Sequence, residues 1–115
     1  MVLFGDVTQV ALESALDNVA LRQRVTASNL SNAATPGYHA QRVDFESALA
    51  SALRAGEPAN VGATISDANT PDNGNGNTVS MENESTALMR NGLQYQSLVQ
   101  AVNYRFDILR SAIGG

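Results

Sequence analysis

The sequence lacks cysteine altogether and has a single histidine, His39. Without cysteine, the chain can form no disulfide, no thiolate metal site and no cysteine nucleophile. With one histidine, it cannot assemble a His-rich zinc site. It also has no Gly-x-Ser-x-Gly elbow, so a serine triad has no recognisable centre. We therefore expect no catalytic, cofactor-binding or metal-binding residues, and in particular no small peptidoglycan hydrolase.

Lysine and tryptophan are also absent. The seven basic residues are all arginines, against eleven acidic residues, which gives a net charge of −4. Nucleic-acid binding needs a basic stripe on one face, and these arginines are scattered, so we expect no nucleic acid as a partner. Aromatic residues make up only 5% of the chain. An apolar content made mostly of alanine, leucine and valine suits thin helical seams better than a wide core.

Two further absences concern membranes and export. The first basic residue is Arg22, and Asp6, Glu13 and Asp17 precede it, so the start of the chain is unlike a cleaved secretory signal peptide. No run approaches the ~18 uninterrupted apolar residues of a transmembrane helix. We expect neither a cleaved signal peptide nor a transmembrane segment.

Helical periodicity is present at both ends of the chain. From 6 to 32, Leu12, Leu16, Val19 and Leu30 recur at helical spacing, which predicts a helix of about 39 Å. From 81 to 113, apolar positions alternate at three- and four-residue steps, as in a coiled-coil seam. The predicted seam consists of Leu88, Tyr95, Val99, Val102, Phe106, Leu109 and Ile113. Helices of this length need a long partner, so we expect them to pack as an antiparallel coiled-coil-like pair.

Between these helices the sequence predicts a short helix and a loop. An amphipathic spacing runs through 44–55, at Phe45, Ala48, Leu49, Ala52 and Leu53. Asp44 is placed to cap its start, and Gly56 and Pro58 to end it. Residues 56–80 are rich in Gly, Asn, Pro and Asp, which predicts a flexible loop. Within it, Val61 to Ile65 suggests a brief strand.

The stretch from Asn29 to Tyr38 predicts a helix end followed by a sharp turn. Pro36 fixes φ at about −65° and Gly37 accepts a positive φ, as a type II turn requires. Asn29, Asn32 and Thr35 have short polar side chains that can bond carbonyl groups left open at a helix end. Residues 33–43 then form a turn and linker, which Tyr38 and Phe45 can anchor to the helix.

The same stretch resembles the signature of the flagellar axial proteins, which are the rod, hook and hook-associated subunits. That signature follows a long N-terminal helix and runs roughly Asn-(Ile/Leu)-Ala-Asn-x-x-Thr-x-Gly-Tyr. The matching positions here are Asn29, Leu30, Asn32, Thr35, Gly37 and Tyr38, which with Pro36 and Phe45 form the predicted assembly motif. Ser31 stands where alanine is usual, and His39 where a cation is usual. Turn chemistry alone leaves open a helix-turn-helix junction in an unrelated bundle.

Further features are similar to those of the proximal rod subunits. They are Arg22-Gln23, Thr35-Pro36-Gly37-Tyr38, Asp44-Phe45-Glu46, Val79, Met81-Glu82, Glu84, Asn91, Tyr95-Gln96 and the ending from Leu109 to Gly114. The resemblance covers about residues 5–55 and 78–115 and leaves the middle unmatched. Hook and distal rod subunits resemble this frame with large domains inserted in the middle, so a short middle favours a proximal rod subunit.

The expected fold is thus a single all-α domain over 1–115, with paired terminal helices, a short third helix and an irregular middle. The resemblance implies a structural subunit of the bacterial flagellar basal-body rod that self-assembles through its terminal helices and transmits motor torque. It implies copies of itself, other rod proteins, and export-gate and rod-junction proteins as partners, with no small-molecule substrate. It also implies export by the flagellar type III apparatus. The alternatives are another rod subunit and a soluble coiled-coil adaptor or export chaperone.

Overall fold

The computed structural model describes residues 4–58 and 61–114, with side chains from residue 7 onward. In these residues the chain forms three helices and two short strands. In chain order they are α1 (Phe4–Ser31), β1 (Gln41–Asp44), α2 (Glu46–Arg54), β2 (Thr64–Asp67) and α3 (Met81–Gly114). The fold is therefore mostly helical, with the long terminal helices that the periodicity predicts.

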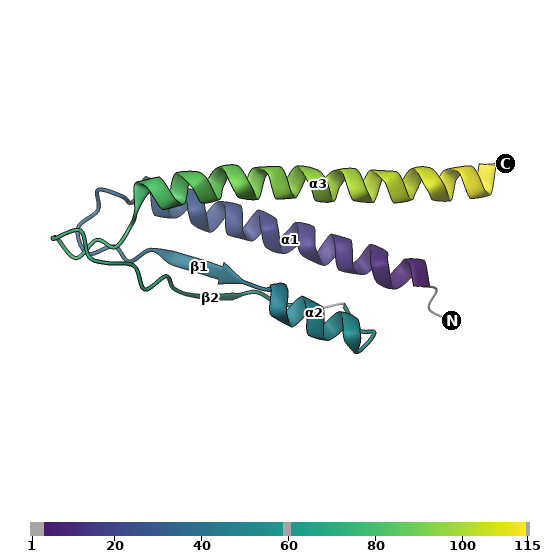
Figure 1. Cartoon of the computed structure of the whole chain (residues 1–115), viewed down its shortest axis with the longest axis horizontal. Helices are drawn as coiled ribbons and strands as arrows, with labels where there is room; N and C mark the ends of the chain where they lie inside the picture. Colours follow the sequence, from purple (N-terminus) through teal and green to yellow (C-terminus); the bar gives the residue numbers. More distant parts are fainter. Residues whose placement is uncertain (1–3, 59–60, 115) are drawn as a thin grey trace.

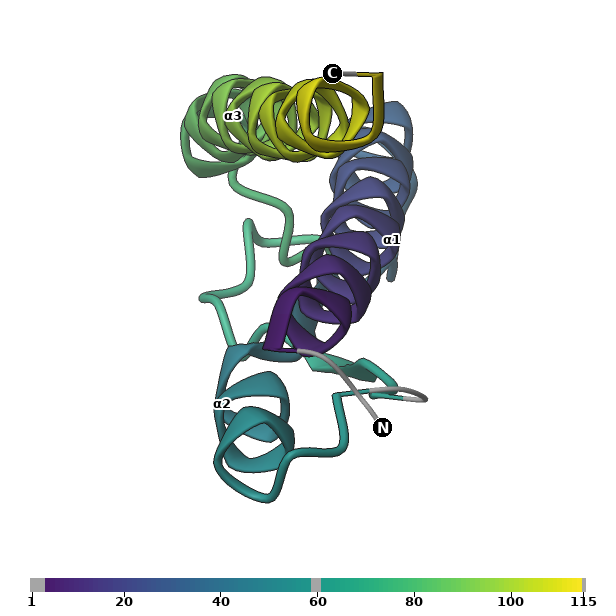
Figure 2. The ribbon, with the colours of Figure 1, turned by 90° about the vertical axis from the view of Figure 1, so that its right-hand side faces the viewer.

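The two long helices lie side by side and run in opposite directions (Figure 1). At 1.5 Å per residue, α1 is about 42 Å long and α3 about 51 Å. They lie closest where α1 ends and α3 begins, and they diverge toward the two ends of the chain (Figures 1 and 2). The antiparallel arrangement agrees with the sequence prediction, whereas the interlocked side-chain packing of a coiled coil stays a prediction.

A two-stranded antiparallel sheet corrects the expectation of an all-α fold. β1 pairs with β2 so that Gln41 lies opposite Asp67 and Asp44 lies opposite Thr64. Residues 41–44, which the sequence places in a linker, satisfy their backbone groups through this pairing with a distant segment. The brief strand expected at Val61 to Ile65 overlaps β2, which lies slightly later in the chain.

The short helix α2 ends as its sequence predicts, but the predicted cap at its start is not formed. It begins after Phe45, and no side chain caps its first turn. The expected cap, Asp44, instead pairs with Arg42 across 3.0 Å. At the other end, Gly56 has a φ of +75° and the amides of Gly56 and Glu57 donate back to Leu53 and Ala52. This is a Schellman ending, in which glycine takes the left-handed position.

The interior is small and unusually polar. Among the side chains that the structure describes, the buried apolar residues are Val19, Ala40, Val43, Phe45, Pro58 and Val79. The buried polar residues are Asn18, Thr26, Asn29, Asn77, Thr78 and Asn91. The molecule measures 62 × 26 × 14 Å with a radius of gyration of 17.6 Å, against about 13 Å for a compact chain of this length. Such a flat, elongated shape leaves much of each long helix uncovered.

The segment from 68 to 80 lies within the predicted loop over 56–80 and contacts the turn after α1, while the flexibility of the loop stays a prediction. Its backbone bonds to the turn after α1, through Thr78 N to Tyr38 O at 3.0 Å and Gly37 N to Asn75 O at 3.1 Å. Ser80 then caps α3, since its Oγ accepts the amide hydrogen of Asn83 at 3.3 Å. The polar composition that predicts disorder instead supplies side chains that bond the backbone.

Candidate assembly interface

The turn after α1 has the geometry that its sequence predicts. Gly37 adopts a φ of +76°, and the amide of Tyr38 donates to Thr35 O at 3.2 Å, as expected for a four-residue turn with glycine in third place. Asn32 Nδ2 donates to Ser28 O at 2.8 Å, and Thr35 Oγ1 donates to Asn32 Oδ1 at 3.1 Å. A local side chain thus bonds Ser28 O, while Asn29 O and Leu30 O accept the amide hydrogens of Asn32 and Ala33.

Asn29 does something different from the helix-end role that the sequence suggests. Its side chain is 1% exposed and points at the first residue of β1 rather than back along α1. Nδ2 donates to Gln41 O at 2.8 Å, and Oδ1 accepts the amide hydrogen of Gln41 at 3.1 Å. Nδ2 also donates to Glu84 Oε1 at 3.1 Å. One carboxamide therefore joins α1, β1 and α3.

The remaining motif residues divide between buried anchors and exposed positions. Tyr38 is half-buried and its hydroxyl donates to Asn29 Oδ1 at 3.3 Å. Phe45 is 3% exposed and anchors the start of α2. Leu30 is half-buried, whereas Pro36 lies at the surface. The structure thus brings Asn29 and Tyr38 together and leaves the tip of the turn accessible.

Asn77 is a central residue that the sequence analysis missed. It is fully buried, and its Nδ2 donates to Asn32 O at 2.8 Å and to Thr35 O at 2.7 Å. Its Oδ1 accepts the amide hydrogen of Val79 at 2.8 Å. Asn77 closes the turn from the loop between β2 and α3, more than forty residues away in the chain. Nothing in a run of alternating Asn and Gly distinguishes it from its neighbours.

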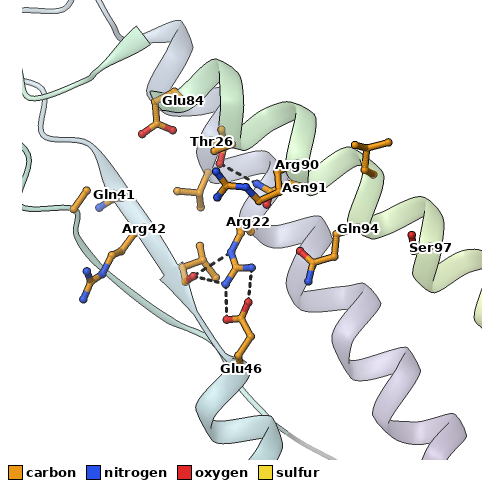
Figure 3. Close-up of a pocket in the computed structure, with 15 residues that line it drawn as sticks. Arg22, Thr26, Gln41, Arg42, Glu46, Glu84, Arg90, Asn91, Gln94 and Ser97 are labelled. Carbon is orange, nitrogen blue, oxygen red and sulfur yellow. Dashed lines mark hydrogen bonds and ion pairs between the residues drawn. The ribbon is translucent and has the colours of Figure 1, made fainter. Parts of the chain in front are cut away.

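Arg22 holds β1 and α2 against α1 (Figure 3). Its guanidinium donates to both carboxylate oxygens of Glu46 at 2.7 Å and to Val43 O at 2.8 Å. It also lies 4.7 Å from the centre of the Phe45 ring. This bidentate contact, more than the backbone donors beside it, lowers the pKa of Glu46 to about 2. In the sequence, Arg22 is singled out only because Arg22-Gln23 resembles the proximal rod subunits.

The same residues form one wall of an open groove between β1, α1 and α3, with a volume of about 620 Å³ (Figure 3). Arg42 of β1 and Glu46 of α2 line one side of it, and Arg90, Gln94 and Ser97 line it from α3. Charges of both signs line this groove, so its walls carry no uniform potential.

The predicted seam of α3 is only partly covered. Leu88, Val99 and Val102 are half-buried toward α1, with Asn91 as the one fully buried side chain of the helix. Tyr95 is 42% exposed, Phe106 and Leu109 are each 48% exposed, and Ile113 is 85% exposed. Because the two helices diverge, the seam continues past the surface that α1 can cover.

A second set of apolar residues lies on α3, turned away from α1. Met89, Leu93, Tyr104 and Ile108 are between 50% and 72% exposed. Their positions fall on the far side of the helix at 100° per residue from the half-buried row. The helix therefore presents apolar side chains on two faces, and within the described part of the chain α1 packs against the first of them, while Leu93 of the second lines the groove.

Across the described residues, no helix is both long and apolar enough to cross a membrane. Nor do the described His, Asp and Glu side chains gather in any group of three that could hold a metal ion.

Comparison with known proteins relates this geometry to a family. The family model described as "Flagella basal body rod protein" matches residues 11–39, which span most of α1 and the turn after it. A flagellar basal body rod protein FlgB of Bacillus subtilis is 33% identical over all of this chain and 98% of its own length. The chain belongs to the FlgB family of flagellar basal body rod proteins.

Other members of the FlgB family support the same assignment. The FlgB protein of Escherichia coli is 33% identical over 79% of this chain and 81% of its own length. The FlgB protein of Cereibacter sphaeroides is 37% identical over 82% of this chain and 84% of its own length. The FlgB family is one of structural rod proteins and not of enzymes. The resemblance read from the motif and from Arg22-Gln23 is therefore confirmed.

Proposed function

We propose that this chain self-assembles into the proximal part of the flagellar rod through its terminal helices. The observation that supports the proposal is the uncovered half of α3, where Phe106, Leu109 and Ile113 continue the seam beyond the reach of α1. Covering a large apolar side chain is worth about 1.5–3 kcal/mol. Neighbouring helices from other subunits are the partners that can complete such a seam without changing the fold of the single chain.

In this proposal the assembly motif sets the angle between α1 and the rest of the subunit. Gly37 and Asn77 hold the turn, and Asn29 fixes β1 and α3 relative to α1. A rod that transmits motor torque needs subunits that do not bend at the turn between α1 and β1. Bending would break the hydrogen bonds of buried polar groups. Each buried group left without a partner costs about 1–3 kcal/mol, so these bonds resist bending.

The proposed partners are copies of this chain, other flagellar rod proteins, and the export-gate and rod-junction proteins at the base of the rod. The proposed route out of the cell is the flagellar type III apparatus without removal of a signal peptide. These expectations rest on family membership, since the relatives are named as basal body rod proteins.

The test uses cells that lack the gene and express single variants of this chain. Phe106→Asp places a charge on the uncovered seam, and Asn103→Asp places one on an exposed polar position of the same helix. We expect Phe106→Asp to abolish swimming and to be missing from isolated basal bodies, while Asn103→Asp supports both. Circular dichroism of the purified chains should show equal helix content, because neither side chain is buried. Normal swimming and normal rod incorporation of Phe106→Asp would refute the proposed role of this face.

A further inference from the structure

The loop between β2 and α3 contains two consecutive Asn-Gly pairs, Asn73-Gly74 and Asn75-Gly76. Such pairs are prone to deamidation because glycine has no side chain to shield its backbone nitrogen. That nitrogen attacks Cγ of the asparagine, forms a C–N bond and expels ammonia, which leaves a succinimide. Water then opens the ring to aspartate or isoaspartate. The net reaction consumes water and releases ammonia, and isoaspartate lengthens the backbone by a methylene group.

Asp72 holds both of the nitrogens that would attack. Its Oδ1 accepts the N–H of Gly74 at 2.6 Å and the N–H of Gly76 at 2.9 Å. To react, each nitrogen must lose its proton and turn toward the side chain of the preceding asparagine. A carboxylate that accepts the N–H opposes both steps, because the bond is charge-assisted and the negative charge disfavours removal of the proton.

Burial does not protect these two asparagines, since both lie at the surface. Asn73 is restrained by its own side chain, whose Nδ2 donates to Val79 O at 2.7 Å. Asn75 Oδ1 accepts only the amide hydrogen of Asn77, at 3.2 Å. A third pair, Asn91-Gly92, lies inside α3, where Asn91 is buried and the helical backbone fixes the geometry. The third pair makes no contact with Asp72 and is an internal reference.

Modification at Asn75 would reach the assembly motif. The carbonyl of Asn75 accepts the amide hydrogen of Gly37 at 3.1 Å. In isoaspartate 75 the backbone would run through the former side-chain carbonyl and the original carbonyl would become a free carboxylate, so the contact with Gly37 would lose its geometry. We propose that Asp72 protects Asn73 and Asn75 from deamidation by holding the attacking nitrogens, and so preserves the contact between the loop and the turn.

The experiment follows deamidation by peptide mapping and mass spectrometry in the intact, purified chain held at neutral pH. It compares the unaltered chain with Asp72→Ala and with Asp107→Ala, which removes an exposed aspartate from α3. We expect Asp72→Ala to speed deamidation at Asn73 and Asn75 by about tenfold or more, the factor for losing a hydrogen bond to a charged group. Asp107→Ala should leave both rates unchanged, and Asn91 should react at one rate in all three chains.

A further variant separates protection by Asp72 from general loosening of the loop. Asn77→Ala removes the side chain that ties the loop to α1 but leaves Asp72 in place. We expect it to accelerate deamidation much less than Asp72→Ala does. Equal acceleration by the two variants would overturn the proposal, because order in the loop would then be the protection. A rate in Asp72→Ala no faster than in the unaltered chain would overturn it as well.

Discussion

At the scale of single residues, asparagine takes positions that apolar side chains usually occupy. Asn29, Asn77 and Asn91 are each at most 4% exposed. A carboxamide has two donor hydrogens and an acceptor oxygen, so one side chain can replace several backbone partners at once. Asn77 uses this capacity fully, with two donated bonds and two accepted bonds, from the Val79 amide and from Asn73 Nδ2 at 3.4 Å. The turn that follows α1 is therefore held by polar contacts and not by a hydrophobic core.

Two glycines of the loop provide a matched test of how closely it packs on the turn. Gly74 and Gly76 both have positive φ, at +109° and +82°. A Cβ on Gly76 would lie 3.1 Å from the Cα of Gly37, whereas a Cβ on Gly74 would meet nothing within 4 Å. Both Gly74→Ala and Gly76→Ala carry backbone strain of about 1–3 kcal/mol. We expect Gly76→Ala to lower the melting temperature further, since it also pushes on the turn. Equal melting temperatures would indicate that the loop does not pack there.

The ion pair of Arg22 and Glu46 predicts a dependence of stability on pH. The pKa of Glu46 is lowered from 4.5 to about 2, so the folded state favours the charged carboxylate. This stabilisation is present above pH 4.5 and is lost as the pH falls toward 2. Because the Glu46 side chain is 57% exposed, we expect a contribution of no more than about 1 kcal/mol.

The measurement compares thermal unfolding of the unaltered chain and of Glu46→Gln across this pH range. The variant should melt at a lower temperature at pH 7, and the two curves should converge as the pH approaches the pKa of about 2. Asp44→Asn, which alters an exposed pair with Arg42, is the control. A difference between Glu46→Gln and the unaltered chain that does not change with pH would contradict the role given to this carboxylate.

At the scale of elements, the pairing of α1 with α3 changes character along its length. Where α1 ends, the contacts are polar, through Asn29 with Glu84 and Thr26 with Asn91. Toward the middle, Gln23 Nε2 of α1 donates to Leu88 O of α3 at 3.3 Å, so the partner helix partly satisfies this polar side chain. Beyond this point the two helices diverge (Figures 1 and 2).

The half-buried row of α3 is tested by a pair of substitutions that differ only in helix face. Val102→Asp places a carboxylate toward α1, where partial desolvation costs about 2–3 kcal/mol. Gln100→Asp places it at an exposed position, where surface changes cost within about 0.5 kcal/mol. We expect Val102→Asp to lower the melting temperature and abolish motility, and Gln100→Asp to do neither. If the two variants behave alike, the heptad assignment of α3 is wrong.

At the scale of the whole molecule, the chain is long and thin and has little interior. Its shortest extent is 14 Å, hardly more than the width of one helix with its side chains, which is about 10–12 Å. A layer this thin buries few residues completely, and the buried set contains as many polar as apolar positions. A single copy therefore gains little from hydrophobic burial relative to the entropy lost on ordering its long helices.

This shape predicts that association stabilises the fold. We expect the melting temperature of the purified chain to rise with protein concentration, because anything that binds only the folded state adds stability by mass action. Sedimentation at the same concentrations should show oligomers. Ile108→Ser, on the apolar face of α3 turned away from α1, should weaken this dependence more than Thr86→Ser, an exposed polar position of the same helix. A monomer with a melting temperature independent of concentration would rule out this expectation.

Local sequence chemistry was sufficient for several parts of the molecule. Apolar periodicity predicts both long helices to within a few residues, and the Pro36-Gly37 pair predicts the turn and its positive φ. The glycine at 56 predicts the end of α2. These features depend on residues close together in the chain, where φ preferences and helical spacing act directly. The match of a contiguous motif also led to the correct family.

Contacts between distant segments were decided only by the tertiary structure. β1 and β2 are four residues each. The sequence predicts a brief strand only near β2, and β1 forms because it pairs with that distant segment. Asn77 bonds residues more than forty positions away, and Asn29 bonds β1 and α3 instead of its own helix end. The exposure of Phe106 and Ile113 follows from the angle between two helices. A heptad pattern predicts which side chains of α3 lie on an apolar face. Only the three-dimensional path of α1 determines which of these side chains α1 covers.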